Sequence, residues 1–292
     1  MSSSDQTLRF LFDNTPIRGE LTQLTRSFKE VLSKHPYPMP VQKLLGEFMA
    51  AAAMLSDTIK FEGTLSLQVR GAGQVRSLMA ECRNNQDLRA LAQYNDDFEE
   101  GGAILGEGQM AITIEPNQGK RYQGIVPIND SDMTLSTVLE DYFQKSEQIR
   151  TRIWLFANTK SAAGFMIQAM PESASVSSLD MTNQEDWERI VHLASTLTEE
   201  EALTLPAETL LHRLFHEETV RLYDPRPLQF KCTCSEERTA NAIITLGREE
   251  ALHIVHEQGH IDIDCQFCHQ RYAFNETDIN TLFDNASNSS LN

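Results

Sequence analysis

The chain has 292 residues, of which 40% are hydrophobic and 14 are phenylalanine, so it is long enough for about two globular domains with a sizeable core. It has no run of about 18 apolar residues, which excludes a membrane-spanning helix, and its polar first residues do not form a secretory signal. The net charge is −17, and residues 179–292 carry 21 Asp and Glu against 8 Lys and Arg, which disfavours a nucleic-acid partner. We therefore expect a protein of the reducing cytoplasm that acts without a membrane.

Residues 1–178 are predicted to form an α+β core domain, because helical and strand patterns follow one another without regular βαβ alternation. Apolar residues at helical spacing predict one helix over 21–32, which ends before a proline-rich stretch, and a second, buried helix over 41–55. Strict alternation of apolar and polar residues predicts half-buried strands over 65–69 and 110–114.

The second half of this domain is predicted to contain a helix and a hairpin. The helix is expected over 135–142, and two apolar strands over 153–157 and 165–170 are joined by a polar turn at 158–161. The serine-rich stretch 171–178 has the composition of a connector. We therefore place the first domain boundary at its end.

Residues 179–230 are predicted to form a metastable helical linker. Thr182 with Glu185, and Thr198 with Glu201, match the capping box of a helix N-terminus. The apolar faces of these helices are narrow, and the segment carries 11 acidic residues against 4 arginines. Short helices of this kind depend on tertiary contacts for their stability. They are expected to come loose when that support is removed.

Four of the five cysteines form two pairs in the last quarter of the chain, Cys232-Thr-Cys234 and Cys265-Gln-Phe-Cys268. Two short loops that each aim two sulfurs at one point are typical of a tetrahedral Zn²⁺ site. The sulfurs within each pair are also able to form a local disulfide, so oxidation is able to empty the metal site. The remaining cysteine, Cys82, ends an apolar strand pattern and is expected to be a packing residue.

Residues 231–292 are predicted to form a C-terminal four-cysteine zinc domain with a small apolar core. Structural zinc contributes roughly 10–16 kcal/mol to the folding of such modules, which is comparable with the stability of a whole domain. Loss of the metal is therefore expected to unfold this domain. The polar tail after Phe283 is expected to be disordered.

The motifs of common enzymes do not occur in the sequence. It has no Walker-type phosphate loop and no H-E-x-x-H motif. Catalytic zinc keeps an open coordination position, which four cysteines do not leave, so we expect no enzyme activity. His253, His256 and His260 are spaced to lie near one helical face, and His269 adjoins Cys268, so a mixed histidine and cysteine site stays open. We expect surface or packing roles for these histidines, because four thiolates complete a structural zinc shell.

Over nearly its whole length the sequence resembles the redox-regulated bacterial heat-shock chaperones, the 33 kDa chaperonin family. The C-x-C pair, followed about thirty residues later by C-x-x-C, matches the cysteine signature of that family. One difference is Gln266, which stands between the last two cysteines where an acidic residue is expected, and which should leave ligation intact. Further similar stretches are His35–Pro38, Leu44–Ala53, Gly108–Pro116, Arg121–Pro127 and Leu214–Glu218.

This resemblance implies an ATP-independent holdase that is inactive while it is reduced and holds one Zn²⁺ ion on Cys232, Cys234, Cys265 and Cys268. It implies that oxidation by peroxide with heat, or by hypochlorite, joins Cys232 to Cys234 and Cys265 to Cys268. Zinc release and unfolding of the C-terminal domain and the linker would follow. The resemblance also implies that the active form exposes apolar surface to unfolding client proteins and forms a homodimer.

Two other functions are compatible with the cysteine pattern. A zinc-ribbon module that contacts nucleic acid or the transcription machinery is one of them, and the acidic C-terminal part disfavours it. A thiol oxidoreductase that uses Cys265 and Cys268 is the other. It is disfavoured because this pair is not expected to follow a strand and open a helix, as thioredoxin-like motifs do. Salt-dependent nucleic-acid binding and insulin reduction are the assays that distinguish these functions from a chaperone.

Overall fold

The computed structural model describes residues 5–58, 62–99, 104–129, 133–170 and 180–289. The chain divides into two compact units, Met1–Lys231 and Cys232–Asn292. Both units combine helices with sheets that are largely or wholly antiparallel, so the predicted α+β class is confirmed. Within the described ranges, no helix is both long enough and apolar enough to cross a membrane.

The first unit is built on two six-stranded sheets. The first sheet contains, in spatial order, β10 (Val220–Leu222), β1 (Gln6–Phe12), β2 (Ile17–Leu24), β9 (Ala162–Ala169) and β8 (Thr151–Ala157), with β11 (Arg226–Pro227) also paired to β1. The second sheet contains, in spatial order, β12 (Gln229–Phe230), β5 (Asp87–Tyr94), β4 (Val75–Arg83), β3 (Gly63–Gly71), β6 (Gly108–Pro116) and β7 (Tyr122–Ile128). Only the pairing of β12 with β5 is parallel among the described strands. The strands predicted over 65–69, 110–114 and 153–157 are confirmed as parts of β3, β6 and β8, and the strand predicted over 165–170 is confirmed as far as Ala169, where β9 ends.

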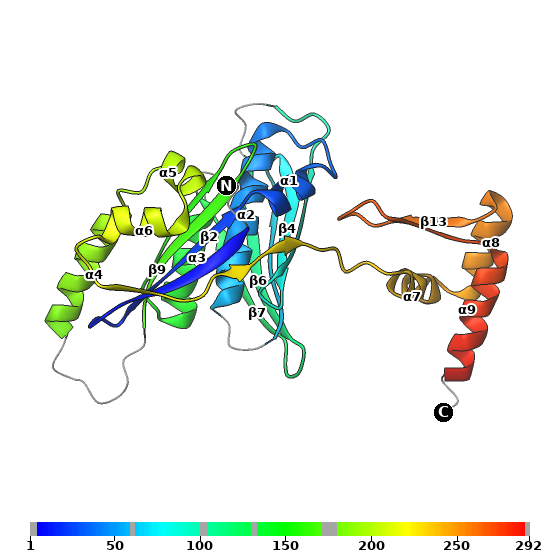
Figure 1. The fold of residues 1–292 in the computed structure, drawn as a ribbon. Coiled ribbons are helices and arrows are strands. Elements are labelled where there is room, and N and C mark those ends of the chain that lie inside the picture. The colour runs from blue at the N-terminus through cyan, green and yellow to red at the C-terminus, as the bar shows by residue number, and fades with distance from the viewer. Residues whose placement is uncertain (1–4, 59–61, 100–103, 130–132, 171–179, 290–292) are drawn as a thin grey trace. The chain divides into compact units, whose positions relative to one another are not determined.

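Helix α2 (Met39–Asp57) lies between the two sheets, at the centre of the larger core (Figure 1). Every residue from Phe48 to Asp57 is buried, because the helix packs against strands of both sheets. The buried helix predicted over 41–55 is therefore confirmed. Helix α3 (Leu135–Tyr142), also predicted, contributes to the same core and continues into a short π-helical turn, η1 (Phe143–Glu147).

The helix predicted over 21–32 is partly wrong. Leu21 and Leu24 belong to strand β2, and only the second half of this segment is helical, as α1 (Arg26–Leu32). Strand β2 is buried on both faces: Leu21 lies in one hydrophobic core of the unit and Leu24 in the other. A strand covered on both sides shows no clean alternation of apolar and polar residues, so its pattern is easily taken for one face of a helix.

Three helices cover the outer face of the first sheet: α4 (Asp180–Ala194), α5 (Glu199–Thr204) and α6 (Ala207–Phe215) (Figure 1). Aromatic rings form the centre of the core between them. Phe10 and Phe165 of the sheet are stacked with ring centroids 5.7 Å apart, and Phe215 of α6 lies 6.2 Å from both. The helices are therefore held by apolar contacts with the sheet.

The predicted helix starts in this region have different outcomes. The capping box of α5 is confirmed, because the side chain of Thr198 accepts from the backbone N–H of Glu201 and the Glu201 carboxylate accepts from that of Thr198. Helix α4 spans Asp180–Ala194, so the predicted helix start at Thr182 lies inside the helix. The connector predicted over 171–178 lies outside the described residues.

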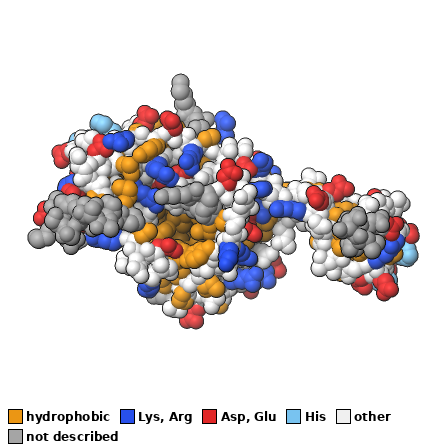
Figure 2. Space-filling model, turned by 90° about the horizontal axis from the view of Figure 1, so that it is seen from below, with side chains coloured by type: hydrophobic (Ala, Val, Ile, Leu, Met, Phe, Trp, Pro, Cys, Tyr) orange, Lys and Arg blue, Asp and Glu red, His pale blue; other side chains and the backbone are white. Residues whose placement is uncertain are grey.

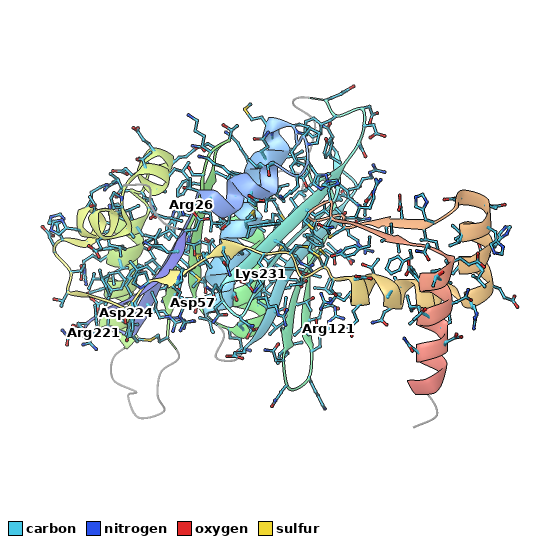
Figure 3. The ribbon with its side chains drawn as sticks, turned by 45° about the vertical axis from the view of Figure 1, so that its right-hand side comes forward. Arg26, Asp57, Arg121, Arg221, Asp224 and Lys231 are labelled. Carbon is cyan, nitrogen blue, oxygen red and sulfur yellow. The ribbon has the colours of Figure 1, made fainter. Side chains whose placement is uncertain are left out.

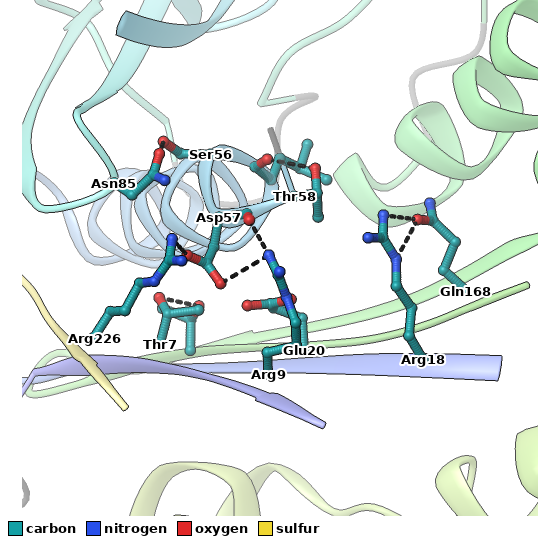
Figure 4. A network of polar contacts seen from close by, with 12 residues as sticks. Thr7, Arg9, Arg18, Glu20, Ser56, Asp57, Thr58, Asn85, Gln168 and Arg226 are labelled. Atoms are coloured by element: carbon teal, nitrogen blue, oxygen red, sulfur yellow. Dashed lines mark hydrogen bonds and ion pairs between the residues drawn. The ribbon is translucent and has the colours of Figure 1, made fainter. Parts of the chain in front are cut away.

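The segment after α6 returns along the first unit through β10, β11 and β12, and Figure 3 labels Arg221 and Lys231 near its two ends. Polar contacts anchor this segment. Arg226 pairs with the buried carboxylate of Asp57 at the end of α2, which Arg9 also approaches to 3.2 Å (Figure 4). Two further ion pairs anchor the segment: Arg221 with Asp13 at 2.9 Å, and Lys231 with Asp87 at 3.0 Å. Residues 180–231 thus pack as part of the first unit, and their division from the core at residue 178 stays a prediction.

The second unit contains α7 (Glu236–Leu246), α8 (Arg248–Gln258), the hairpin of β13 (Ile261–Asp264) and β14 (Arg271–Phe274), and α9 (Glu276–Ser289). Six buried apolar residues form its core: Ile243, Ala251, Val255, Ile261, Phe274 and Ile279. A core of this size supplies little stability, so the unit depends on a further source of it.

The tail predicted to be disordered after Phe283 is helical as far as Ser289, where α9 ends, and its last three residues lie outside the described ranges. Asn275 starts this helix. Its Oδ1 accepts from the backbone N–H groups of Thr277 at 2.8 Å and Asp278 at 3.1 Å, and the Asp278 carboxylate accepts from the N–H of Asn275 at 2.9 Å. A helix needs only one apolar stripe, so polar residues are able to extend it beyond its last large apolar side chain.

Candidate metal centre

The first cysteine pair lies immediately before α7. Ser235 caps this helix, because its Oγ accepts a hydrogen bond from the backbone N–H of Arg238 at 3.2 Å. The Arg238 guanidinium in turn donates to the carbonyl oxygen of Thr233 at 3.1 Å and to its Oγ1 at 2.9 Å. The first turn of α7 therefore holds the loop that carries Cys232 and Cys234.

The second cysteine pair occupies the turn of the hairpin between β13 and β14. The backbone N–H of Cys265 donates to the carbonyl of Gln270 at 2.9 Å, and that of His269 donates to the carbonyl of Cys265 at 2.8 Å. His269 closes the turn in a left-handed conformation, with φ of 58°. The chain continues from Cys268 into a strand, which is not the helix start that a thioredoxin-like pair requires.

These two loops bring the four sulfurs together. All four Sγ atoms lie within 4.8 Å of one another. The Sγ of Cys232 is 3.6 Å from that of Cys265, and the Sγ of Cys234 is 3.4 Å from that of Cys268. Four sulfurs bound to Zn²⁺ at about 2.3 Å form a tetrahedron with edges of about 3.8 Å. The donor set and its spacing therefore fit a tetrahedral metal ion, and it is the one such cluster in the described part of the chain.

The cluster gathers ionisable thiols in partly buried surroundings. Burial raises the pKa of the Cys265 and Cys268 thiols above the usual value. At Cys232, hydrogen bonds from the backbone N–H of Cys234 and from the other thiols outweigh the effect of burial and lower the pKa. Thiolates this close repel one another, so all four lose their protons only when a cation is present to compensate the charge. Binding of a metal ion at this cluster would therefore be coupled to deprotonation of the thiols.

The histidines considered as further ligands do not belong to this cluster. His253 and His256 are exposed on α8, and each lies 3.5 Å from a glutamate carboxylate. His260 lies 3.2 Å from Asp262. His269 contributes its backbone to the turn. Among the described residues, the one group that could hold a metal ion consists of sulfur alone.

Two further residues bear on the chemistry of sulfur. Cys82 lies on β4 in the first unit and is fully buried, and burial raises the pKa of its thiol to about 12, so it is protonated at neutral pH. Tyr272 on β14 donates a hydrogen bond from its hydroxyl to the Sγ of Cys234 at 3.3 Å. In the sequence, only its place shortly after Cys268 distinguishes Tyr272 from an ordinary core aromatic.

Comparison with known proteins agrees with this architecture. Residues 5–275 match the family model described as Hsp33 protein. The 33 kDa chaperonin of Pseudomonas syringae pv. syringae is 49% identical over 286 residues, which cover 96% of this chain and 93% of that protein. The 33 kDa chaperonin of Azotobacter vinelandii is 48% identical over 288 residues, with coverage of 97% and 96%.

The fold is shared with a solved structure. The crystal structure of the 33 kDa chaperonin of Thermotoga maritima matches with a TM-score of 0.80, covers 97% of this chain and 99% of that chain, and is 20% identical in sequence. At this identity the match establishes a common fold. The family model and the two bacterial relatives extend over nearly all of the sequence, and they show that the chain belongs to the Hsp33 protein family.

Proposed function

We propose that this protein is an ATP-independent holdase chaperone, inactive when reduced and zinc-bound and activated by oxidants. The observation that carries the proposal is a cluster of four sulfurs in a unit whose core has six buried apolar residues. A bound Zn²⁺ ion would neutralise the thiolates of Cys232, Cys234, Cys265 and Cys268 and join the two loops that carry them. The names of the bacterial relatives support client-protein binding, and the proposal includes no catalytic activity.

Oxidation would convert each pair of thiolates into one disulfide. In each conversion two thiolates give up two electrons and form one S–S bond, while one hydrogen peroxide takes up two protons and becomes two waters. A disulfide sulfur is no longer an anionic ligand, so the metal site is lost. From the family resemblance we propose the local pairs Cys232–Cys234 and Cys265–Cys268.

The pairing decides what oxidation does to the second unit. Sulfur distances of 3.6 and 3.4 Å across the loops do not by themselves exclude the pairs Cys232–Cys265 and Cys234–Cys268. These partners are 33 and 34 residues apart, so the first disulfide formed between the loops would stabilise the fold by about 4 kcal/mol. Local disulfides close loops of a few residues and constrain the chain much less. Disulfides within each loop remove the link that a metal ion would form between the two loops and put no new link in its place. We propose that the second unit then unfolds.

The proposed linker, residues 179–230, is the next element to respond. Its helices cover aromatic residues of the first sheet, among them Phe10 and Phe165. Helix α5 has only six residues, and isolated helices of that length are not stable in water. We propose that the linker melts once it detaches from residues 1–178. Apolar surface of both the linker and the sheet would then become available to unfolding client proteins.

Some apolar surface is exposed even while these helices are docked. Figure 2 shows hydrophobic side chains gathered in the middle of one face of the first unit, with Lys and Arg side chains around them. The exposed large hydrophobic residues of the unit include Tyr122 and Ile125 on β7, and Leu222 and Tyr223 at the end of β10. We propose that the oxidised protein forms a homodimer through apolar surface and works in the cytoplasm.

The second unit also bears on the choice of partner. It carries 10 acidic residues and 3 arginines, so its own charge repels phosphate backbones. We therefore propose that neither a nucleic acid nor a membrane is a partner of this protein.

The test measures zinc, free thiols and chaperone activity in one sample of full-length protein, before and after treatment with peroxide at elevated temperature. We expect one zinc per chain to be lost together with four thiols, and the treated sample to suppress aggregation of a heat-unfolded protein. Cys82→Ser is the matched control and should respond like the wild type, because Cys82 lies outside the sulfur cluster. A treated sample that keeps its zinc and its fold would contradict the proposal, and peptide mapping distinguishes the two disulfide patterns.

A further inference from the structure

The edge of the first sheet at β1 is covered by an extended segment, residues 219–228, which we call the strap. Its backbone continues the sheet in the antiparallel direction. The N–H of Tyr223 donates to the carbonyl of Arg9 at 3.0 Å, and the N–H of Asp13 donates to the carbonyl of Thr219 at 2.9 Å. The chain itself therefore occupies the place of a further strand beside β1.

The strap makes few apolar contacts at this edge. Leu222 stands opposite Phe10 in the register, on the face that the linker helices cover, yet Leu222 is 42% exposed. Tyr223 beside it is 44% exposed. Pro225 and Pro227 have no backbone N–H, so neither is able to donate to β1. The strap therefore leaves part of the edge and of its apolar face unused.

Two ion pairs hold the strap in place. Arg221 pairs with Asp13 at 2.9 Å, and Arg226 pairs with the buried carboxylate of Asp57 (Figure 4). These pairs need arginines at two fixed positions, which a foreign chain has only by chance. A foreign chain with an apolar residue at every second position would instead bury its side chains beside those of β1 while its backbone completes the ladder.

The opposite edge of the same sheet is protected in another way. It is formed by β8, where the N–H of Ile153 donates to the Glu140 carboxylate of α3 at 2.7 Å. Helix α3 precedes the proposed linker, residues 179–230, whereas the strap belongs to it. Melting of the linker would therefore open the edge at β1 and leave the edge at β8 protected. An open edge presents unpaired N–H and C=O groups to any extended chain.

We propose that β1, once the strap has left it, binds an extended segment of an unfolding client protein as an added antiparallel strand. This inference rests on the proposed function and names the surface that it uses. Leu8, Phe10 and Phe12 alternate along β1 and face the linker helices, so apolar side chains at every second position of the client would lie beside them. The strap is an intramolecular substitute for the client, and its ion pairs keep the site closed.

The first test measures binding of a short peptide to the oxidised, full-length protein by fluorescence anisotropy. The peptide alternates apolar and polar residues, and two further versions carry equal numbers of backbone N-methyl groups, on either the apolar or the polar residues. In a strand, these two sets of N–H groups point to opposite edges. Leu222 shares the face of Phe10, and the N–H that reaches β1 is that of its neighbour Tyr223. The polar residues of the client are therefore the ones whose N–H groups β1 accepts.

The two methylated peptides differ only in the position of the methyl groups, so each is the control for the other. Methylation at the polar positions should weaken binding at least about tenfold, because it removes two or more backbone hydrogen bonds. Methylation at the apolar positions should leave the affinity nearly unchanged, because those N–H groups point away from β1.

The second test measures hydrogen exchange of β1 in the same protein. Leu11 pairs with Arg221 of the strap, and its N–H points to the strap as that of Asp13 does. Exchange of the Leu11 amide should be at least about tenfold faster in the oxidised protein than in the reduced protein, and it should slow again when the peptide binds. The amide of Phe10, which points to β2, should stay protected throughout and is the internal control.

Three results would overturn the inference. Equal affinities of the two methylated peptides would mean that binding depends on apolar contact alone. A bound peptide that leaves the Leu11 amide unprotected would place the client elsewhere. Protection of Leu11 in the oxidised protein that disappears on dilution would show that a second copy of the chain occupies the edge. An oxidised protein that fails to suppress aggregation of a heat-unfolded protein would instead refute the proposed function, so the two failures are distinguishable.

Discussion

Replacement of Arg226 by glutamine should loosen the segment after α6 while the metal centre stays intact. Arg226 pairs with Asp57, whose side chain is 4% exposed, whereas that of Arg226 is 50% exposed. Asp57 would keep one charged partner, Arg9, at 3.2 Å. The substitution therefore weakens the network drawn in Figure 4 without leaving a buried charge unpaired.

The free energy of local opening that Arg226→Gln removes lies between two limits. Breaking a fully buried ion pair costs about 3–5 kcal/mol, and an exposed pair contributes only about 0–1 kcal/mol. Because Arg226 is half exposed and Asp57 keeps Arg9, we expect the free energy of local opening to fall by about 1–2 kcal/mol. This corresponds to a roughly 5- to 30-fold larger open population. The control is Arg221→Gln, which breaks the pair with Asp13, whose side chain is 31% exposed against 61% for Arg221.

Native-state hydrogen exchange of the backbone amides in β10 and β11 measures this opening directly. The amide of Tyr223, which donates to the carbonyl of Arg9 at 3.0 Å, is a suitable reporter. Its exchange should accelerate about 5- to 30-fold in Arg226→Gln and clearly less in Arg221→Gln, with the same zinc content in both. Equal exchange in the two variants would refute the argument that the buried pair holds this segment.

Three further predictions concern metal, pH and packing. Removal of the metal by a strong chelator under reducing conditions should unfold the second unit, seen as loss of helical circular dichroism, and leave the first unit folded. Burial, and then the nearby Asp57, raise the pKa of Glu20 well above its usual range. The protonated carboxyl therefore contributes its full stability at acidic pH. That contribution is lost as the pH rises from about 4.3, the pKa in the unfolded chain, through the higher pKa in the folded protein. In urea denaturation, the free energy of unfolding of Glu20→Gln should therefore increase relative to that of the wild type as the pH rises. An unchanged difference in this free energy between pH 5 and pH 8 would contradict the prediction. Leu210→Ala in α6, at a fully buried position, should destabilise linker docking by roughly 2–5 kcal/mol and produce client binding without oxidant, whereas Leu222→Ala, at an exposed position, should not.

The fold could be predicted from the sequence where an element is buried on a single side or is apolar throughout. Apolar and polar residues alternate along strand β3 because only one of its faces is fully buried. Helix α2 is recognisable because its own residues are mostly small or apolar, and every residue from Phe48 to Asp57 is buried. Strand β2 could not be predicted, because the layer that covers its second face is formed by residues 180–215, far along the chain. No local pattern contains that information.

The cluster of four sulfurs could be predicted because the geometry of a metal site built from cysteines constrains their spacing within each loop. Tyr272 and the Asp57 network could not, because their partners are distant. The hydroxyl of Tyr272 acts on a sulfur 38 residues earlier, and Asp57 pairs with an arginine 169 residues later. An acidic residue at the end of an otherwise buried helix is the one local sign that Asp57 needs a cationic partner.

The junction between Lys231 and Cys232 explains why loss of the metal does not by itself have to release the linker. The backbone N–H of Lys231 donates to the carbonyl of Leu88 at 2.9 Å and its Nζ lies 3.0 Å from Asp87, so the first unit holds the chain up to the residue before the first ligand. When the second unit unfolds, these contacts and the pair of Arg226 with Asp57 remain. They are few and β12 has only two residues, so we expect heat to open this end of the segment. The helices of residues 180–215 are held separately, by their apolar contacts with the first sheet. In the proposed switch, oxidant and heat would therefore act on different contacts.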